Sequence, residues 1–272
     1  MRRFTWFNAT SLTLGFVFLY LPMVLLIIFS FNASKLVTVW AGFSTKWYGE
    51  LLRNEAFLDA AWVTIKVAVF SSTIATILGT MAAYVLVRGG RFFGRTLFSG
   101  MIYAPLVMPE VITGLSLLLL FISIGLDRGV FTIVLAHATF SMCFVSVVVS
   151  SRLVTFDRSL EEAALDLGCS GFEAFRRVTL PIIAPAVISG WLLAFTLSLD
   201  DLVIASFTAG PSATTLPIKI FSAVRLGVSP EINALSTIMI AIVAIGVISA
   251  SLITKRNSVL QQRDEQAAAR AA

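Results

Sequence analysis

The stretch EEAALDLGCSGFEAFRRVTLPIIAPAV, from Glu161 to Val187, is charged and rich in turn signals, whereas most of the chain is apolar. Acidic residues and paired alanines come first, a glycine and two arginines follow, and two prolines lead into an apolar run. A long apolar segment also precedes the stretch. The pattern indicates a structured polar element between two hydrophobic segments.

Capping signals divide this part of the chain into two short helices. Ser159 and Glu162 have the spacing of a capping box, in which each side chain bonds to a backbone N–H at the start of a helix. Ser170 and Glu173 repeat the spacing. Gly168 lies between them, where the end of a helix favours a left-handed residue. The sequence therefore predicts a helix, a glycine turn and a second helix.

The second helix is expected to end at Pro181, because proline cannot continue a helix and Arg176 and Arg177 suit the negative end of its dipole. Two short helices are not ordered by propensity alone. Ala163 and Ala164 offer a smooth surface for close approach. The pair therefore either docks into another protein or caps its own helix bundle, and the residues leave both alternatives open.

The composition predicts an all-α polytopic membrane protein. Of the 272 residues, 58% are hydrophobic and 13% are charged, whereas soluble domains are about half apolar and a quarter charged. A membrane span needs about 20 mostly apolar residues. We expect one transmembrane domain over residues 1–272, with the polar loop at 150–185. Six candidate spans are 11–31, 60–87, 97–124, 129–149, 186–209 and 234–254.

The distribution of lysine and arginine predicts the orientation of these spans. Short cytoplasmic loops carry an excess of both residues. With the N-terminus inside, the inner segments hold thirteen of the twenty, the outer segments hold six, and Lys66 lies within a span. We therefore expect both termini and the loop 150–185 in the cytoplasm.

The polar loop resembles the EAA signature of permease subunits of bacterial ABC importers. That signature reads EAA, three residues, G, nine residues, I, one residue, LP. One position departs from it, where valine replaces isoleucine with the loss of a methylene. The resemblance implies that the loop is a coupling helix, which sits in a cleft of an ATP-binding subunit and transmits closure of the ATPase dimer to the spans. The matching residues are Glu162, Ala163, Ala164, Gly168, Val178, Leu180 and Pro181.

Further stretches resemble the polyamine branch of this family, and most of all its second, putrescine-type permease. They are YAPLVMPEVITGLSLLL (103–119), LSLDDLVIASFTAGP (197–211) and GVSPEINAL (227–235). Related branches for other small solutes share the coupling motif, so another solute is the alternative substrate.

The resemblance also implies where the protein acts and with what partners. It implies the bacterial cytoplasmic (inner) membrane, a heterodimer with a homologous permease, two ATP-binding subunits and a periplasmic polyamine-binding protein. Transport would proceed by alternating access, with ATP and Mg²⁺ on the partner ATPase and no cofactor in this chain. Membrane lipid surrounds the spans, and no nucleic-acid partner is expected.

Three carboxylates inside expected spans are candidates for the substrate path. Ionisable residues within a bilayer cost about 2.5–3.5 kcal/mol each on insertion scales and mark functional sites by default. Glu110 follows Pro109 near the middle of the third span, and Asp200 and Asp201 lie in the fifth. Asp201 continues a stripe of small residues, whereas Asp200 is turned about 100° away. Carboxylates beside a low-dielectric passage suit a polycation, although bonding to a neighbouring helix is the alternative.

Other chemistry finds little support in the sequence. A phosphate-binding G-x-x-x-x-G-K-[ST] loop is missing, so the chain is not expected to hydrolyse ATP or to be an enzyme. His137, Cys143 and Cys169 have no metal-ligand spacing, so no metal site is predicted. An ion-coupled secondary transporter is the less favoured alternative, because it predicts inverted repeats and none is clear. A channel would require rings of charge from several copies.

Overall fold

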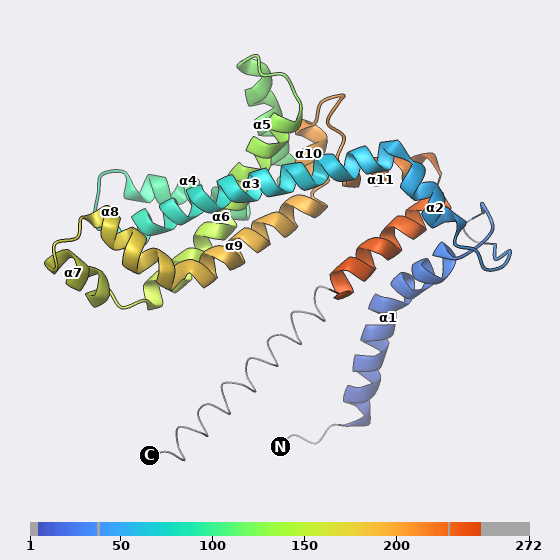
Figure 1. Ribbon diagram of the computed structural model, residues 1–272, viewed down its shortest axis with the longest axis horizontal. Helices are drawn as coiled ribbons and strands as arrows, with labels where there is room; N and C mark the ends of the chain where they lie inside the picture. Colours follow the sequence, from blue (N-terminus) through green and yellow to red (C-terminus); the bar gives the residue numbers. More distant parts are fainter. Residues whose placement is uncertain (1–4, 37–38, 228, 246–272) are drawn as a thin grey trace. The chain divides into compact units, whose positions relative to one another are not determined.

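The computed structural model describes residues 5–36, 39–227 and 229–245, which form helices joined by loops (Figure 1). They belong to two compact units. One unit contains the residues up to Glu55 and those from Ala223 onward, and the other is Ala56–Ser222. The first unit holds α1 (Trp6–Ser30), α2 (Lys46–Arg53) and an apolar helix, Pro230–Ile245.

The second unit holds the candidate site, and only the ends of α3 and α11 extend beyond it. Its elements are α3 (Glu55–Arg88), α4 (Arg95–Val107), α5 (Glu110–Ser123), α6 (Val130–Thr155), α7 (Ser159–Asp166), α8 (Gly171–Ala174), the π-helical turn η1 (Phe175–Thr179), α9 (Leu180–Asp200), α10 (Val203–Thr208) and α11 (Leu216–Leu226).

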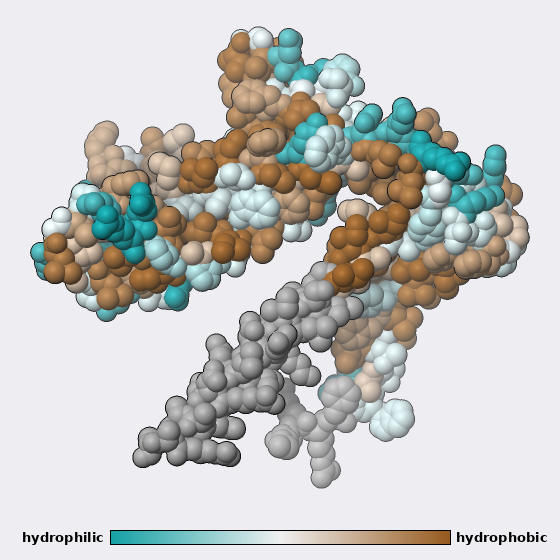
Figure 2. Space-filling model, in the orientation of Figure 1, coloured by the Kyte–Doolittle hydropathy of each residue, from teal (hydrophilic) through white to brown (hydrophobic). Residues whose placement is uncertain are grey.

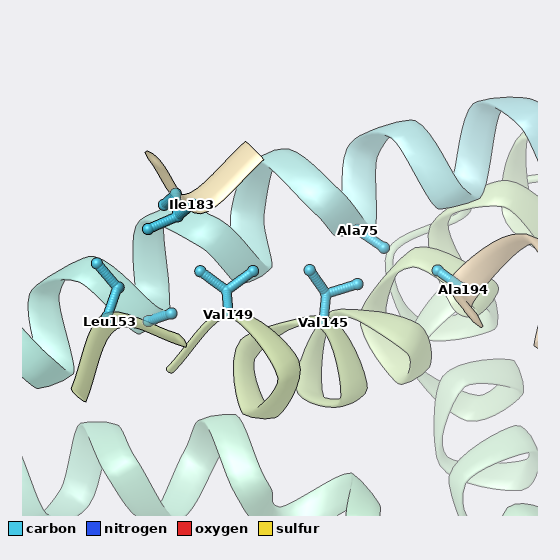
Figure 3. Close-up of a cluster of buried hydrophobic side chains, with 7 residues drawn as sticks. Ala75, Val145, Val149, Leu153, Ile183 and Ala194 are labelled. Atoms are coloured by element: carbon cyan, nitrogen blue, oxygen red, sulfur yellow. The ribbon is translucent and has the colours of Figure 1, made fainter. Parts of the chain in front are cut away.

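The core of this unit lies where α3, α6 and α9 pack together. Val145 and Val149 of α6 are fully buried, and their side chains point toward the neighbouring helices, where Ala75 and Ile183 contribute to the same cluster (Figure 3). Small residues permit this close packing. A Cβ at Gly79 of α3, for example, would lie 2.7 Å from a backbone oxygen of α6.

The all-helical fold is confirmed, but the described residues do not establish six spans. Four helices are long and apolar enough to cross a membrane, and a bent pair would make five. They are α1, α3, α6 and the continuous helix Gly171–Asp200, and the bent pair is α4 with α5. The expected sixth span, 234–254, is described only to residue 245, and its remainder lies outside the described residues.

The expected third span, 97–124, is not one helix. It breaks between α4 and α5, whose axes are bent by 118°. Met108 is extended (ψ 135°) and Pro109 precedes α5. Proline disfavours the helical conformation of the residue before it, and its ring also clashes with the preceding turn. The segment expected as one span is therefore two helices that meet at a complete break.

The expected fifth span, 186–209, has different bounds at both ends. The helix is already continuous from Gly171, and it breaks at Asp201 before α10. The prediction that Pro181 ends the second loop helix is wrong, because Pro181 lies in the first turn of α9. The preceding turn η1 is π-helical, with Leu180 N–H donating to the Phe175 carbonyl oxygen. That wider turn comes directly before Pro181, which has no N–H to donate to a preceding carbonyl.

Candidate functional site

The polar loop between α6 and α9 forms two short helices, as the sequence predicts, but the first is capped by a different residue. The N-cap is Arg158, and no Ser159–Glu162 capping box forms. Instead, the Asp157 carboxylate accepts a hydrogen bond from the Ser159 backbone N–H at 3.0 Å. This bond and one from the Ser159 hydroxyl lower the pKa of Asp157 below its usual range. The carboxylate at the helix start also suits the dipole.

The second capping box is confirmed. The Glu173 N–H donates to the Ser170 hydroxyl at 3.3 Å, and the Ser170 N–H donates to the Glu173 carboxylate at 3.0 Å. The bonds from Ser170 lower the pKa of Glu173, and the charge of Arg177 lowers it further. α8 therefore has a fixed beginning although it is only four residues long.

Gly168 forms the predicted left-handed turn, with φ of +89°. The Cys169 N–H donates to the Ala164 carbonyl and the Gly168 N–H donates to the Leu165 carbonyl. This pair of bonds is the Schellman arrangement, which satisfies the last carbonyls of α7. An added Cβ at Gly168 would meet nothing within 4 Å, so the requirement for glycine is conformational.

A buried carboxylate joins this loop to the membrane helices. The side chain of Glu161 is 10% exposed, and its Oε2 lies 2.8 Å from Nε of Arg88 at the end of α3. Its Oε1 accepts a 2.6 Å hydrogen bond from the hydroxyl of Thr179 in η1. Arg88 also donates to the Phe156 carbonyl at 3.2 Å, just after α6. One carboxylate thus links α7 to α3 and to the helix that continues into α9.

Sequence reasoning did not single out Glu161. The only signal in the sequence is that Glu161 and Glu162 are adjacent. Neighbouring residues of a helix point about 100° apart, so the two glutamates face different sides of α7. Glu162, the glutamate of the signature, is exposed and pairs with Arg158 on its own helix at 3.1 Å. The residue that holds the loop is therefore the neighbour of the residue that matches the motif.

The other signature residues divide between two faces of the loop. Ala164 is buried and Leu180 packs against the core, whereas Ala163 and Pro181 are exposed. Figure 2 shows hydrophilic side chains gathered at the α7–α8 end of this unit. Large apolar side chains are exposed there as well, namely Leu160, Leu165, Leu167 and Phe172. One face of the loop thus packs on the bundle, and the other presents a mixed polar and apolar surface. Capping the bundle and docking into another protein are therefore compatible.

The side chain of Asp201 is 8% exposed at the break between α9 and α10. Its Oδ1 accepts a 2.7 Å hydrogen bond from the Ala205 N–H, and it lies 3.3 Å from Nε2 of His137. The other ring nitrogen of His137 lies 2.7 Å from the Ser198 hydroxyl, to which Ser71 donates at 3.1 Å. Asp201 therefore caps α10 and completes a polar network across three long helices. A direct contact between Asp201 and a substrate stays a prediction.

Asp200 and Glu110 are exposed on the surface of the same unit. Glu110 is the first residue of α5, one turn before Gly114, and Asp200 is the last residue of α9, four residues before Ile204 of α10. A Cβ at Gly114 would come within 3.3 Å of the Ile204 Cα, so the two backbones touch there. Each carboxylate is therefore four residues along the chain from this contact, Glu110 by one turn of α5 and Asp200 across the break between α9 and α10. Their role in a substrate path stays a prediction.

Within the described ranges, no three His, Cys, Asp or Glu side chains gather in a way that could hold a metal ion. Cys143 is buried and Cys169 is partly buried, and both are free thiols.

Comparison with known proteins relates both the sequence and the fold to transport systems. The family described as "Binding-protein-dependent transport system inner membrane component" matches residues 75–258. The chain is 58% identical over 265 residues to the putrescine transport system permease protein PotI of Escherichia coli (strain K12), covering 95% of this chain and 94% of that protein. It is 44% identical over 244 residues to the spermidine/putrescine transport system permease protein PotC of the same strain, covering 90% and 92%.

Solved structures agree with this fold at low sequence identity. A chain of a bacterial ABC transporter involved in the import of the acidic polysaccharide alginate superposes with a TM-score of 0.69 at 18% identity, covering 90% of this chain and 93% of that one. A chain of the MetNI methionine ABC transporter gives 0.59 at 15% identity, covering 76% and 95%. These likenesses show the shared helical fold.

Proposed function

Because the chain belongs to the family of binding-protein-dependent transport system inner membrane components, we propose that it is the permease subunit of an ATP-driven polyamine importer. Identity of 58% to a putrescine permease over almost the whole chain supports putrescine as the substrate class. The structural observation that carries the mechanism is the Glu161 anchor, which fixes the exposed loop helices to α3 and η1.

The anchor supplies a path for force between the loop and the membrane helices. An ATP-binding subunit that pulls on the mixed surface of α7 and α8 would move Glu161, and with it the end of α3 and the start of α9. Capped helices and a buried charge pair resist bending, so displacement at the loop reaches the spans. We expect a homologous permease, two ATP-binding subunits carrying ATP and Mg²⁺, and a periplasmic binding protein to complete the importer. Alternating access is then the opening of the spans to one side at a time.

The carboxylates beside the two helix breaks suit a cationic substrate. An ammonium group that leaves water loses hydration, and an anionic side chain recovers part of that energy where the dielectric is low. Asp200 and Glu110 are exposed and available for such contacts. Asp201 would support them by holding the break at which Asp200 lies.

Reconstitution tests the proposal. The permease pair, its ATPase and its binding protein are placed in liposomes, and uptake of labelled putrescine and spermidine is measured with and without ATP. ATP-dependent uptake of either polyamine supports the function. Uptake of a different solute would reassign the substrate. Uptake that follows an ion gradient without the ATPase would replace the importer with a secondary transporter.

A further inference from the structure

A cavity of about 630 Å³ lies between the ends of three membrane helices. It is bordered by the last residues of α3, the first half of α4 and the last turns of α6. This is the end of the unit from which the loop of α7 and α8 emerges. Its polar lining residues are Arg95, Thr96, Ser99, Tyr103 and Ser150, and its apolar lining residues are Leu86, Val87 and Val154.

Ser150 lines this cavity and carries an unsatisfied hydroxyl. Its Oγ is buried, and the structure gives it no hydrogen-bond partner among the described residues. Neighbouring hydroxyls of α6 bond back to their own helix: Ser151 donates to the Val148 carbonyl at 2.7 Å and Thr155 to the Arg152 carbonyl at 2.9 Å. A buried hydroxyl without a partner is destabilising. The atom is closed to solvent, so an acceptor oxygen in the cavity would satisfy it once the Ser150 side chain turns toward the cavity.

Arg95 supplies the charge that selects the ligand. One guanidinium nitrogen donates to the Leu86 carbonyl at 2.7 Å, which holds the group at the cavity wall. A guanidinium has five N–H donors, so this bond leaves others for a ligand. No carboxylate lines the cavity in the described part of the chain. The balance of charge therefore favours an anion.

The beginning of α4 adds further donors. Arg95 and Thr96 open this 13-residue helix. The Arg95 N–H donates to the Phe92 carbonyl at 3.3 Å, and the N-cap, Gly94, has no side chain to satisfy the N–H groups that follow. These groups and the helix dipole favour a bound anion. The hydroxyls of Ser99 and Tyr103 also line the cavity on this helix. Arginine, hydroxyls and a helix start together are the donor set expected for a phosphate group.

We propose that this cavity binds the phosphate of an anionic phospholipid headgroup. The lining suits both ends of such a headgroup, because Arg95 and the hydroxyls face the phosphate and Val87 and Val154 can contact the glycerol and first methylenes. A volume of about 630 Å³ is within the range of small-ligand pockets, roughly 300–1,000 Å³. Basic pockets between spans at the cytoplasmic side are typical sites for anionic headgroups.

The position of the cavity gives the lipid a structural consequence. Leu86 and Val87 immediately precede Arg88, the residue that anchors Glu161 of the coupling loop. A lipid bound against them would hold the end of α3 that carries this anchor. The predicted cytoplasmic position of the loop is used only to assign the leaflet, and the proposed function is not needed for binding.

Native mass spectrometry of the complete transporter complex tests the site by counting retained lipids. The complex is delipidated in detergent and titrated with phosphatidylglycerol or with phosphatidylcholine as the zwitterionic control. Arg95→Gln and Ser150→Ala are compared with wild type. Ser150→Ala removes a hydroxyl without a protein partner, so its effect cannot come from a lost internal hydrogen bond. Arg91→Gln is the matched control, because Arg91 is exposed in the loop that leads into α4 and does not line the cavity.

We expect phosphatidylglycerol to bind wild type and Arg91→Gln equally and to bind Arg95→Gln about tenfold more weakly, as for loss of one charge-assisted hydrogen bond. Ser150→Ala should weaken binding by a smaller factor. Inorganic phosphate separates the two sources of the anion. If phosphate displaces the lipid and raises the melting temperature without it, a free phosphate is the ligand and the lipid source is wrong. Equal phosphatidylglycerol binding by all four proteins would overturn the site. Transport is not measured, so failure of the proposed function would not affect this outcome.

Discussion

Nε of Arg88 lies 2.8 Å from Oε2 of Glu161, which joins the last residue of α3 to the first turn of α7. Both side chains are about nine-tenths buried. Removing one partner of a buried ion pair leaves an unpaired charge and costs about 3–5 kcal/mol. The pair is therefore a rigid connection rather than a surface contact.

Replacing Glu161 by glutamine should uncouple the loop from the spans. The amide retains the shape and can still accept a bond from Thr179, but it loses the charge attraction to Arg88. We expect a complex that assembles, with ATPase activity that the loaded binding protein no longer stimulates fully, and uptake at least tenfold slower. Uptake and stimulated ATPase activity in liposomes are the measurements.

Glu162→Gln is the stability control for that variant. Glu162 is exposed and pairs only with Arg158 on its own helix, and exposed pairs contribute about 0–1 kcal/mol. We expect near-normal stability from this variant. Wild-type coupling in Glu161→Gln would show that the anchor does not transmit force.

Gly168→Val should disturb the turn between the loop helices. Its φ of +89° is a conformation that a β-branched residue adopts only with strain, about 1 kcal/mol or more. We expect weaker assembly with the ATPase, measured by co-purification, and lost transport, with ligand affinity of the binding protein unchanged. Gly171→Val is the control, because Gly171 has equal open space but no positive φ. If Gly168→Val transports normally, the turn has no part in coupling.

The local signals in the sequence predicted the second capping box and the left-handed glycine because each depends on a few adjacent residues. Ser170, Glu173 and Gly168 all occupy the expected geometry. The first cap was mispredicted because Asp157, two residues before Ser159, offers a charged acceptor that competes for the same N–H. Which side chain accepts from this N–H depends on the direction in which the chain enters the helix. The serine-to-glutamate spacing of a capping box does not specify that direction.

The long-range features could not be predicted from spacing. Glu161 is bonded to Arg88, 73 positions earlier in the chain, and to Thr179 across a glycine turn. Asp201 was expected on one face of a continuous helix, but the helix ends there and the carboxylate caps the next one. A sequence pattern gives the face of a helix, whereas the partner on that face depends on packing.

The predicted orientation can be tested by cysteine labelling with a membrane-impermeant reagent. Ser159 and Ser212 are both exposed, at opposite ends of the second unit's long helices. A cysteine at 159 should label only after permeabilisation, and one at 212 should label in intact spheroplasts. Position 258, which lies outside the described residues, should behave like 159. The native cysteines are first replaced by serine. Labelling at 159 in intact spheroplasts would reverse the orientation.

Three amide variants test the substrate path: Asp200→Asn, Glu110→Gln and Asp201→Asn. They distinguish a carboxylate that contacts the substrate from one that supports the helix break. An amide keeps the shape and hydrogen bonds but loses the charge attraction, which is strongest where water is scarce. If Asp200 and Glu110 contact the cation, their variants should assemble with wild-type melting temperatures and slow putrescine uptake about tenfold, equivalent to about 1.4 kcal/mol. Asp201→Asn should slow uptake and also lower the melting temperature, because Asp201 faces His137 at 3.3 Å inside the core.

Uptake of labelled putrescine and spermidine is read beside thermal stability and stimulated ATPase activity for each variant. Asparagine caps helices about as well as aspartate, so loss of stability in Asp201→Asn would report the histidine contact rather than the cap. His137→Gln is the complementary variant, and it should lower stability by at least as much because it disturbs this contact and the 2.7 Å contact with Ser198. If all three amide variants assemble and transport at the wild-type rate, these carboxylates do not compensate the charge of the substrate. The coupling role of Glu161 would be unaffected, because it depends on separate helices and a separate measurement.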